Sequence, residues 1–380
     1  MNGHKWLRRA AGRCLALATV AGMAFSQTER TEGAEGAYPA PKGVKFIADI
    51  PYREGNEAWM VDIAMPAESG GAPRAAVLAV HGGGWTSGDK NGQRVLINYL
   101  AEHGYVGVGV RYRLTGEAPF PACIEDAKCA TRWLRAHAAD YSVDPNRIGA
   151  FGHSAGAHLA AMLGVAPKSA GLDDGPWQDQ SSLVNAVCGV ATPTDFVNGR
   201  ESRRFKTENE ARKCSPITYA NADAPPFLLI QGTKDGTVDP QQAKRFADAL
   251  RAAGAKNVNL VLLDELGHDP LPSHEAILRP MILAFFDTTI GSQAGLLGRQ
   301  VDMAEEYRTT RRTAEGYKFD KVAQFDKDGD GKISRSEFGG TGEMFARIDR
   351  NFNGCIEKEE MESQPTSQRQ GGRRGNVTPE

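Results

Sequence analysis

Six short apolar runs alternate with longer segments of mixed polarity through the middle of the chain. The runs are AAVLAV (75–80), VGVGVRY (106–112), RIGAF (147–151), VNAVCGV (184–190), FLLIQG (227–232) and VNLVLLD (258–264). Several are almost wholly apolar, as expected for parallel strands that are covered on both faces. The segments between them are predicted to be helical at 91–102, 122–138, 155–164, 240–253 and 275–286. This alternation of strand and helix predicts an α/β fold with a mostly parallel sheet.

Two more strands are predicted ahead of this region. Apolar and polar residues alternate at 44–52 and again at 58–66, with the turn REGN between them. We expect this pair to be antiparallel and to form one edge of the sheet. The segments 165–182 and 196–224 are irregular and polar, and they are predicted to pack over the carboxyl edge of the sheet as a lid or insert.

The first residues have the pattern of a secretory signal peptide. Basic residues lie within 5–13, a short apolar run follows at 14–25, and a small-x-small cleavage site ends at Ser26. The run is too short to span a bilayer. We therefore expect a signal peptide at 1–26, a linker at 27–42 and an exported mature chain, periplasmic or extracellular, with no membrane span. The alternative is an N-terminal helix of the fold.

Composition and cysteine number narrow the class of protein. The chain is 41% hydrophobic and 24% charged with a formal net charge of -2. It is therefore globular, and its charge gives no reason to expect a nucleic-acid partner. Export would leave five cysteines in an oxidising compartment, an odd number that cannot all pair within one chain. A Cys188–Cys214 bridge and buried free thiols both stay open.

The segment FGHSAGAH carries the candidate nucleophile. Its pattern Gly152-x-Ser154-x-Gly156 lies between a predicted strand and a predicted helix, which is the context of a nucleophile elbow. A Cβ at either glycine would crowd neighbouring backbone in so sharp a turn. Ser154 would then lie at a helix N-terminus, which favours developing negative charge. The alternative is a coincidental glycine pattern.

A second glycine-rich motif, HGGGW at 81–85, directly follows a predicted strand. Its glycines leave backbone N–H groups accessible, and an acyl-transfer oxyanion needs such donors. We predict Gly83, Gly84 and Ala155, the residue after the nucleophile, as oxyanion donors. An ordinary glycine-rich turn would explain the glycines but not their pairing with an elbow. Trp85 would either wall an acyl pocket or belong to the core.

Two aspartates compete for the role of triad acid, which follows the nucleophile in this order of elements. Asp239 precedes Pro240, and Gln242 is at the third helical position, so Asp239 reads as an N-cap in a capping box. Asp235 lies in the loop just past the strand 227–232 and has no capping role. Asp235 is therefore the predicted acid.

The base must follow the acid, and only two histidines do so. His268 comes directly after a strand end, whereas His274 is predicted to open the next helix as an exposed residue of its first turn. His268 is therefore the predicted base. His81 and His153 lie on the wrong side in chain order and are expected only to shape the pocket.

Taken together, the motifs resemble a known family. HGGGWTSGDK, VRYRL, GHSAGAHLAAML, ATPTDF, QGTKDGTVDP and LGHD are similar to the secreted bacterial branch of α/β-hydrolase esterases near hormone-sensitive lipase, closest to the acetyl-esterase and feruloyl-esterase-like group. The resemblance implies an α/β-hydrolase catalytic domain at 43–290. It also implies the triad Ser154, Asp235 and His268 and the oxyanion donors Gly83, Gly84 and Ala155. Gln231 departs from the histidine that relatives commonly have there, at a position taken to lie outside the triad.

Two calcium loops are predicted near the end of the chain. DKDGDGKISRSE at 326–337 has oxygen side chains at alternate positions, glycine at the sixth and glutamate at the twelfth, and DRNFNGCIEKEE at 349–360 follows the same spacing. Tandem loops of this kind resemble a paired EF-hand, in which Ile333 and Ile356 would form a short β-bridge. The predicted ligands are Asp326, Asp328, Asp330, Lys332 (through its carbonyl), Ser334, Glu337, Asp349, Asn351, Asn353, Cys355 (through its carbonyl), Glu357 and Glu360.

The calcium module is expected at 314–363, between a connector at 291–313 and a disordered tail at 364–380. Extracellular calcium does not vary as cytosolic calcium does, so a metal-dependent structural staple is favoured over a sensor. The second loop has fewer formal charges in its first five positions and is expected to bind more weakly.

The leading hypothesis is an exported serine carboxylic ester hydrolase that acts on acetyl or feruloyl esters of polysaccharides or on similar small esters, with Ca²⁺ and no organic cofactor. One alternative is a serine peptidase of the prolyl-oligopeptidase type, disfavoured because a short linker stands where those enzymes usually have a β-propeller. Another is a calcium-dependent binding module without catalysis, disfavoured by the intact Ser, Asp and His set.

Overall fold

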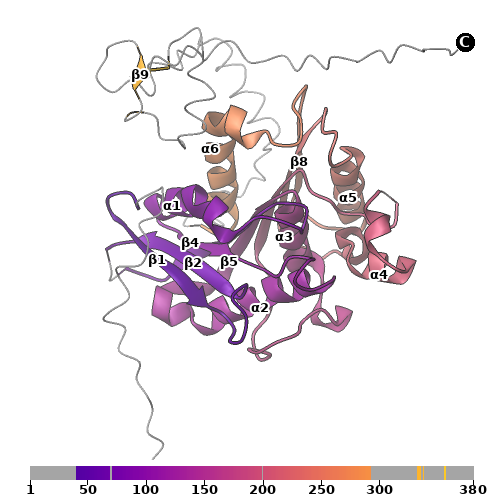
Figure 1. Ribbon diagram of the computed structural model, residues 1–380, viewed down its shortest axis with the longest axis horizontal. Coiled ribbons are helices and arrows are strands. Elements are labelled where there is room, and N and C mark those ends of the chain that lie inside the picture. Colours follow the sequence, from indigo (N-terminus) through magenta and orange to yellow (C-terminus); the bar gives the residue numbers. More distant parts are fainter. Residues whose placement is uncertain are drawn as a thin grey trace, which may run out of the picture. The chain divides into compact units, whose positions relative to one another are not determined.

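Eight strands form one mixed sheet in the order β1-β2-β4-β3-β5-β6-β7-β8 (Figure 1). Their bounds are β1 Val44–Pro51, β2 Met60–Pro66, β3 Arg74–Val80, β4 Val106–Val110, β5 Val143–His153, β6 Ala186–Val190, β7 Phe227–Gly232 and β8 Val258–Leu263. From β4 to β8 every neighbouring pair is parallel, whereas β1 and β2 are antiparallel to each other and β2 is antiparallel to β4. The predicted strands and the antiparallel edge are confirmed.

Helices cover both faces of this sheet. One face packs against α2 (Ala122–Ala136), α3 (Ala155–Val165) and α5 (Gln241–Ala252), and the other against α1 (Arg94–Glu102) and α6 (Leu271–Thr289). Shorter helical segments lie in the connections: η2 Lys90–Gln93, η3 Ala138–Tyr141, η4 Lys168–Ala170, η5 Arg200–Arg204, α4 Glu208–Lys213 and η6 Pro216–Tyr219. Layers of helix, sheet and helix follow from strands that are apolar on both sides.

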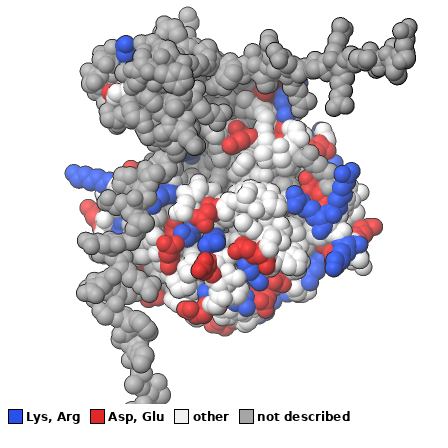
Figure 2. Space-filling view, in the orientation of Figure 1, with Lys and Arg blue, Asp and Glu red and all other residues white. Residues whose placement is uncertain are grey.

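The computed structural model describes residues 40–68, 71–198, 200–291, 332–334, 337 and 355–356. The predicted signal peptide, most of both linkers and the tail lie outside these residues. Among the described helices, none combines the length and the apolar character needed to cross a bilayer. On the face drawn in Figure 2, the described acidic and basic side chains are intermixed, in keeping with a net charge of -2.

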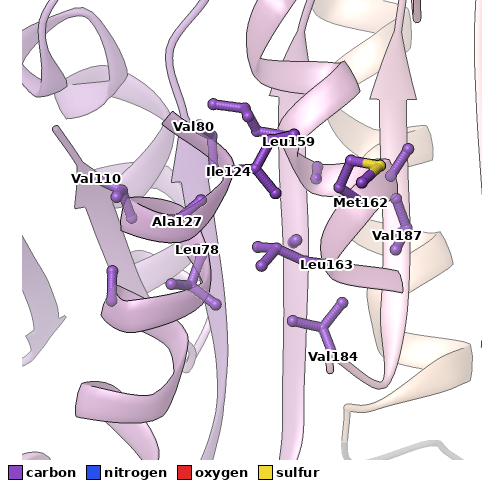
Figure 3. Packing of buried hydrophobic residues seen from close by; sticks show 14 of the residues in the cluster. Leu78, Val80, Val110, Ile124, Ala127, Leu159, Met162, Leu163, Val184 and Val187 are labelled. Atoms are coloured by element: carbon purple, nitrogen blue, oxygen red, sulfur yellow. The ribbon is translucent and has the colours of Figure 1, made fainter. Parts of the chain in front are cut away.

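Alternate residues of each central strand enter opposite cores. Leu78 of β3 and Val187 of β6 share a buried cluster with Ile124 of α2 and Leu163 of α3 (Figure 3). Val77, the neighbour of Leu78, belongs to the cluster that α6 closes on the other side. Successive side chains of a strand point to opposite faces, so both must be apolar here. Burying each such side chain contributes roughly 1.5–3 kcal/mol.

The predicted lid at 165–182 is wrong in its placement. Asp173 in this segment pairs with Lys128 at 3.0 Å and with Arg132 at 2.8 Å, and both cations are buried on α2. Buried charges need an opposite charge, and Asp173 supplies it. The segment therefore packs along α2 because it neutralises that helix.

Candidate active site

Ser154 lies in a sharp turn between β5, which ends at His153, and α3, which begins at Ala155. Its backbone has φ 55° and ψ -120°, a strained conformation for a residue with a side chain. A Cβ on Gly152 would come within 2.2 Å of the Gly156 carbonyl carbon, and a Cβ on Gly156 within 2.0 Å of the Val80 oxygen. Only glycine fits at these two positions, as the sequence pattern predicted.

The structure brings Ser154, His268 and Asp235 together in one hydrogen-bonded chain. His268 Nε2 is 2.9 Å from Ser154 Oγ, and His268 Nδ1 is 2.9 Å from Asp235 Oδ2. Asp235 follows β7 and His268 follows β8, so all three residues lie beyond the carboxyl ends of parallel strands. The Asp235 side chain is fully buried, whereas that of His268 is 23% exposed. The exposed end of the chain is thus the end at which a substrate could arrive.

Asp235 is held as a carboxylate. Burial by itself raises the pKa of this carboxyl, but hydrogen bonds from His268 and from the N–H groups of Val238 and Thr237 outweigh it, and the pKa lies below its usual value. The two backbone groups donate to Oδ1 at 2.7 Å from Thr237 and 2.9 Å from Val238. An ionised acceptor fixes His268 with its proton on Nδ1 and leaves Nε2 free to take a proton.

The competing candidates have other partners. Asp239 Oδ1 accepts from the N–H of Gln241 at 2.9 Å, where α5 begins. The predicted capping box is wrong, because the Gln242 side chain instead accepts from the N–H groups of Thr194 and Asp195. His274 does not open its helix either.

α6 begins three residues before His274, at Leu271, and His274 forms a kink with φ -130° and ψ 26°. The proline pair Pro270 and Pro272 around this start explains the earlier boundary, since proline is well suited to the first helical turn. His274 does lie in the first turn, but the prediction that it opens the helix as an exposed residue is wrong, because it is half-buried and lies at a bend.

The glycine loop after β3 lies beside Ser154, the candidate nucleophile. A Cβ on Gly82 would be 3.5 Å from Ser154 Cβ, and Gly83 and Gly84 have φ values of 113° and 60°. The Gly83 carbonyl accepts from the N–H groups of Thr86 and Ser87, both at 3.1 Å, which fixes the turn. Within the described residues, the N–H groups of Gly83 and Gly84 donate to no protein acceptor. They are therefore available to a ligand, as is the Ala155 N–H, which has no acceptor inside its helix.

Tyr112 holds the start of this loop in a way that sequence reasoning did not predict. Its ring stacks on His81 with 4.2 Å between centroids, and its hydroxyl donates to the His81 carbonyl at 3.0 Å. Both residues are buried. Burial lowers the pKa of His81, which keeps the ring neutral in this stack. The motif VRYRL contains this tyrosine, but no sequence pattern identifies its partner.

Trp85 lies in the core rather than on an exposed wall. It is 3% exposed and packs edge-on against Phe120 and Phe196, and its indole N–H donates to His158 Nδ1 at 3.2 Å. His158 Nε2 in turn donates to the Cys214 carbonyl at 2.8 Å, and burial lowers the pKa of His158 to about 4. Phe196 and Cys214 both belong to the predicted insert at 196–224, which therefore packs on the residue that follows the glycine loop.

The His153 side chain contacts the base loop, as expected for a residue that shapes the site. Its Nε2 is 2.9 Å from the His268 carbonyl oxygen and donates to it, and the two rings lie 5.0 Å apart. The residue before the nucleophile thus fixes the backbone of the candidate base.

Gln231 lies outside the candidate triad, as predicted, but it contacts the candidate acid, which the sequence did not reveal. Its side chain is buried at the end of β7, and Nε2 donates to Asp235 Oδ2 at 2.9 Å.

Four cysteines of the described residues are free, buried thiols: Cys123, Cys129, Cys188 and Cys214. The Cys188–Cys214 bridge is therefore not formed.

Only part of the predicted calcium module is described. β9 (Ile333–Ser334) pairs antiparallel with β10 (Cys355–Ile356), and the backbone of Ile333 is in register with that of Ile356, which confirms the predicted bridge between the loops. The Glu337 carboxylate accepts from the N–H and the hydroxyl of Ser334, at 2.8 Å and 2.7 Å. The remaining predicted ligands lie outside the described residues: Asp326, Asp328, Asp330, Asp349, Asn351, Asn353, Glu357 and Glu360.

No group of three or more His, Cys, Asp or Glu side chains that could hold a metal occurs within the described ranges. The described ligands, the carbonyls of Lys332 and Cys355 with the side chains of Ser334 and Glu337, do offer oxygen. Oxygen is the donor that calcium takes. The residues present are therefore chemically suited to the ion.

Comparison with known proteins assigns the fold and the family. A mostly parallel eight-stranded sheet with helices on both faces, a serine at the turn after β5 and the acid and histidine after β7 and β8 define the α/β-hydrolase fold. The sequence matches the BD-FAE family over residues 61–250, half of the chain, and the EF-hand family over residues 323–339. The chain therefore belongs to the BD-FAE family.

Its relatives carry the names of esterases. Esterase LipQ of Mycobacterium tuberculosis is 34% identical over 58% of this chain and 56% of its own length, and the probable carboxylic ester hydrolase LipM of the same organism is 31% identical over 55% and 53%. The chain thus spans little more than half the length of these curated relatives. A thermophilic esterase of Thermogutta terrifontis is 27% identical with a TM-score of 0.58, over 69% of this chain and 97% of its own.

Replacement of Gly83 by alanine is expected to lower the free energy of unfolding by about 1–3 kcal/mol. The φ of 113° is strained for any residue with a side chain, and the new Cβ would lie 2.0 Å from the Ser87 oxygen. Thermal unfolding of both proteins measures the effect. Gly116→Ala is the matched control, since a Cβ there meets nothing within 4 Å. Equal melting temperatures for the two variants would contradict the assigned loop geometry.

Proposed function

We propose that the chain is a serine carboxylic ester hydrolase with Ser154 as nucleophile, His268 as general base and Asp235 as the orienting acid. The observation that carries the proposal is the continuous hydrogen-bonded chain, 2.9 Å from Ser154 Oγ to His268 Nε2 and 2.9 Å from His268 Nδ1 to Asp235 Oδ2. The esterase names of the relatives and of the Thermogutta terrifontis structure support the same reaction class.

The first half of the reaction acylates the serine. His268 Nε2 takes the proton of Ser154 Oγ as this oxygen attacks the ester carbonyl carbon. The carbonyl oxygen becomes an oxyanion, which the N–H groups of Gly83, Gly84 and Ala155 are placed to stabilise. Asp235 stabilises the imidazolium through Nδ1 and does not itself take up the proton.

The second half releases the acid. His268 returns the proton to the leaving alcohol oxygen as the ester C–O bond breaks, which leaves an acyl-serine. Water then gives a proton to His268 and attacks the acyl carbon, and collapse of that intermediate restores Ser154 and yields a carboxylic acid. One water is consumed for each ester cleaved.

The proposed substrates are acetyl or feruloyl esters of polysaccharides, or similar small esters. Two relatives of known structure bear on the substrate, and the propionate bound to the first supports a short acyl group. One is the Thermogutta terrifontis esterase with propionate bound, 25% identical with a TM-score of 0.53, and the other is a bifunctional GH43-CE protein of Bacteroides eggerthii, 27% identical with a TM-score of 0.58. The rings of Trp85, Phe120 and Phe196 pack edge-on against one another next to the glycine loop, and we expect them to limit the room for a long acyl chain.

Replacement of Ser154 by alanine is expected to lower kcat for p-nitrophenyl acetate by about 10⁴- to 10⁶-fold, because the acyl-enzyme can no longer form. The steady release of p-nitrophenol measures this loss. Ser181→Ala, at an exposed serine in the segment beside α2, is the control and should keep full activity. A Ser154 variant that hydrolyses this ester as fast as the wild type would refute the triad.

Activity assays on other substrates distinguish the candidate substrate classes. Acetylated xylan, a feruloylated sugar and a proline-containing peptide are offered to the wild type at equal concentrations. Acid release from either ester supports the proposal, and cleavage of the peptide alone would favour the peptidase alternative. No turnover of any of these substrates or of p-nitrophenyl acetate would favour a binding module.

We propose further that the protein is exported, on the strength of the basic and apolar pattern of residues 1–26. Expression of the full chain in a bacterial host is expected to yield a mature protein in the periplasm or medium that begins near Gln27. Cell fractionation with N-terminal sequencing measures this. Removal of residues 1–26 is the control and should retain the protein in the cytoplasm; an uncleaved wild type found only there would overturn the proposal.

The C-terminal region is proposed to bind calcium at two EF-hand loops and to use it as a structural staple. The family match covers the first loop, at residues 323–339. The pairing of Ile333 with Ile356 supports a second loop, since paired EF-hands join their loops through this residue position. The metal would be held by the carboxylates and carbonyls of the two loops, and it would supply folding free energy rather than chemistry.

Chelation is expected to abolish a calcium-dependent unfolding transition and to leave kcat for p-nitrophenyl acetate within about twofold, since a staple does not act on the triad. Scanning calorimetry of the full chain with calcium and with EDTA measures the unfolding transition, and the ester assay measures kcat. Glu337→Gln should weaken the calcium effect and Glu54→Gln, in the turn after β1, should not. Identical calorimetric scans with calcium and with EDTA would contradict the structural role of calcium.

A further inference from the structure

Gln231 makes a contact to the candidate acid that the reaction described above does not use. It is the residue before Gly232 at the end of β7, and its side chain has no exposed surface. Its Nε2 donates to Asp235 Oδ2 at 2.9 Å. Asp235 Oδ2 also lies 2.9 Å from His268 Nδ1. Gln231 therefore contacts the carboxylate oxygen through which Asp235 holds the base.

The orientation of the Gln231 amide is fixed by Asp235. Its Oε1 is buried and accepts no hydrogen bond from any described residue. Exchanging the two ends of the amide would place this oxygen against the carboxylate, and two acceptors in contact repel each other. The amide thus presents N–H to Asp235 although its other end meets no donor among the described residues.

Each oxygen of Asp235 has its own donors besides His268. Oδ1 accepts from the N–H groups of Thr237 and Val238, both in the loop that carries Asp235. For Oδ2 the described donor is Gln231, which comes from β7, a buried strand between β6 and β8 in the sheet. A carboxylate held at one oxygen can still rotate, whereas one held at both cannot. Gln231 thus connects the orientation of the triad acid to the sheet.

We propose that Gln231 is a positioning residue for catalysis: its amide N–H orients Asp235 Oδ2 toward His268 Nδ1. The proposal rests on the triad function given above. A neutral donor suits this position, since it supports the carboxylate without the full charge of a cation, which would compete with the imidazolium for Asp235.

The unsatisfied oxygen makes the proposal separable from a structural role. A buried acceptor without a partner costs stability, and an apolar side chain of similar length removes that cost together with the donor. Gln231→Met is therefore expected to keep the melting temperature within a few degrees of the wild type. Its kcat for p-nitrophenyl acetate should fall about tenfold, with KM changed less than twofold, because the loss affects the acid and not substrate binding.

Gln242→Met is the matched control. Gln242 is also buried, but its Oε1 accepts from two backbone N–H groups, those of Thr194 and Asp195. Its loss leaves two donors without partners, so the melting temperature should fall while kcat of the folded protein stays unchanged. A positioning residue and a structural glutamine are thus expected to behave in opposite ways in the same two measurements.

Gln231→Glu adds a pH readout. A carboxyl group beside Asp235 is expected to have a raised pKa, because burial and the neighbouring negative charge both disfavour ionisation. While protonated it donates to Oδ2, so kcat should approach that of the wild type near neutral pH. Above its titration the donor is lost, and kcat should fall at alkaline pH where the wild type keeps its activity.

The following outcomes test whether Gln231 positions Asp235. A tenfold loss of kcat in Gln231→Met at unchanged melting temperature, with an alkaline decline in Gln231→Glu, supports the proposal. Full kcat in Gln231→Met, or a loss no larger than its loss of folded protein, overturns it. Ser154→Ala and Asp235→Asn are measured alongside: if they too keep activity, the triad itself is wrong, whereas if only Gln231→Met keeps activity, the positioning role alone fails.

Discussion

The close crossing of α3 over the end of β3 is the constraint on which the site depends. A side chain at Gly156 would reach within 2.0 Å of the Val80 carbonyl oxygen, so the two backbones are in direct contact. This contact forces the chain to turn sharply at Ser154, whose φ of 55° is the cost of the turn. It also brings the glycine loop, which begins directly after Val80, to the side of the nucleophile. One packing contact therefore positions both Ser154, the proposed nucleophile, and the glycine loop that carries the proposed oxyanion donors.

The order of the strands supplies the rest of the site. β5, β6, β7 and β8 are parallel neighbours, so the loops that follow them emerge at one edge of the sheet. Asp235 and His268 come from two of these loops and meet Ser154 there. Each loop is also tied to the core by a buried hydrogen bond, Gln231 to Asp235 in one case and His153 to the His268 carbonyl in the other. Side chains at the ends of rigid strands thereby hold Asp235 and His268, which lie on loops, in position.

Much of this arrangement could be predicted from the sequence, because it follows from local patterns. Apolar runs gave the strands, β7 at its observed bounds, and the glycines of the elbow gave the turn at Ser154. Side-chain partners across the fold could not be predicted. All six residues of β7 are buried, so no polar alternation showed which way Gln231 points. Gln242 fitted a capping box locally, but the N–H groups of Thr194 and Asp195 compete for it.

Holding the groups around the site in place lowers the free energy of unfolding. Burial of the apolar cores must offset that loss. Besides the strained turn at Ser154, three side chains near it have a buried polar atom without a partner in the described part of the chain: His81, Thr192 and Gln231. Each such atom costs about 1–3 kcal/mol. Exclusion of bulk water from a buried site strengthens the hydrogen bonds that orient the acid and the loop. A site whose donors are already aligned needs no reorganisation when charge develops, so the same burial that costs stability is what makes these groups effective.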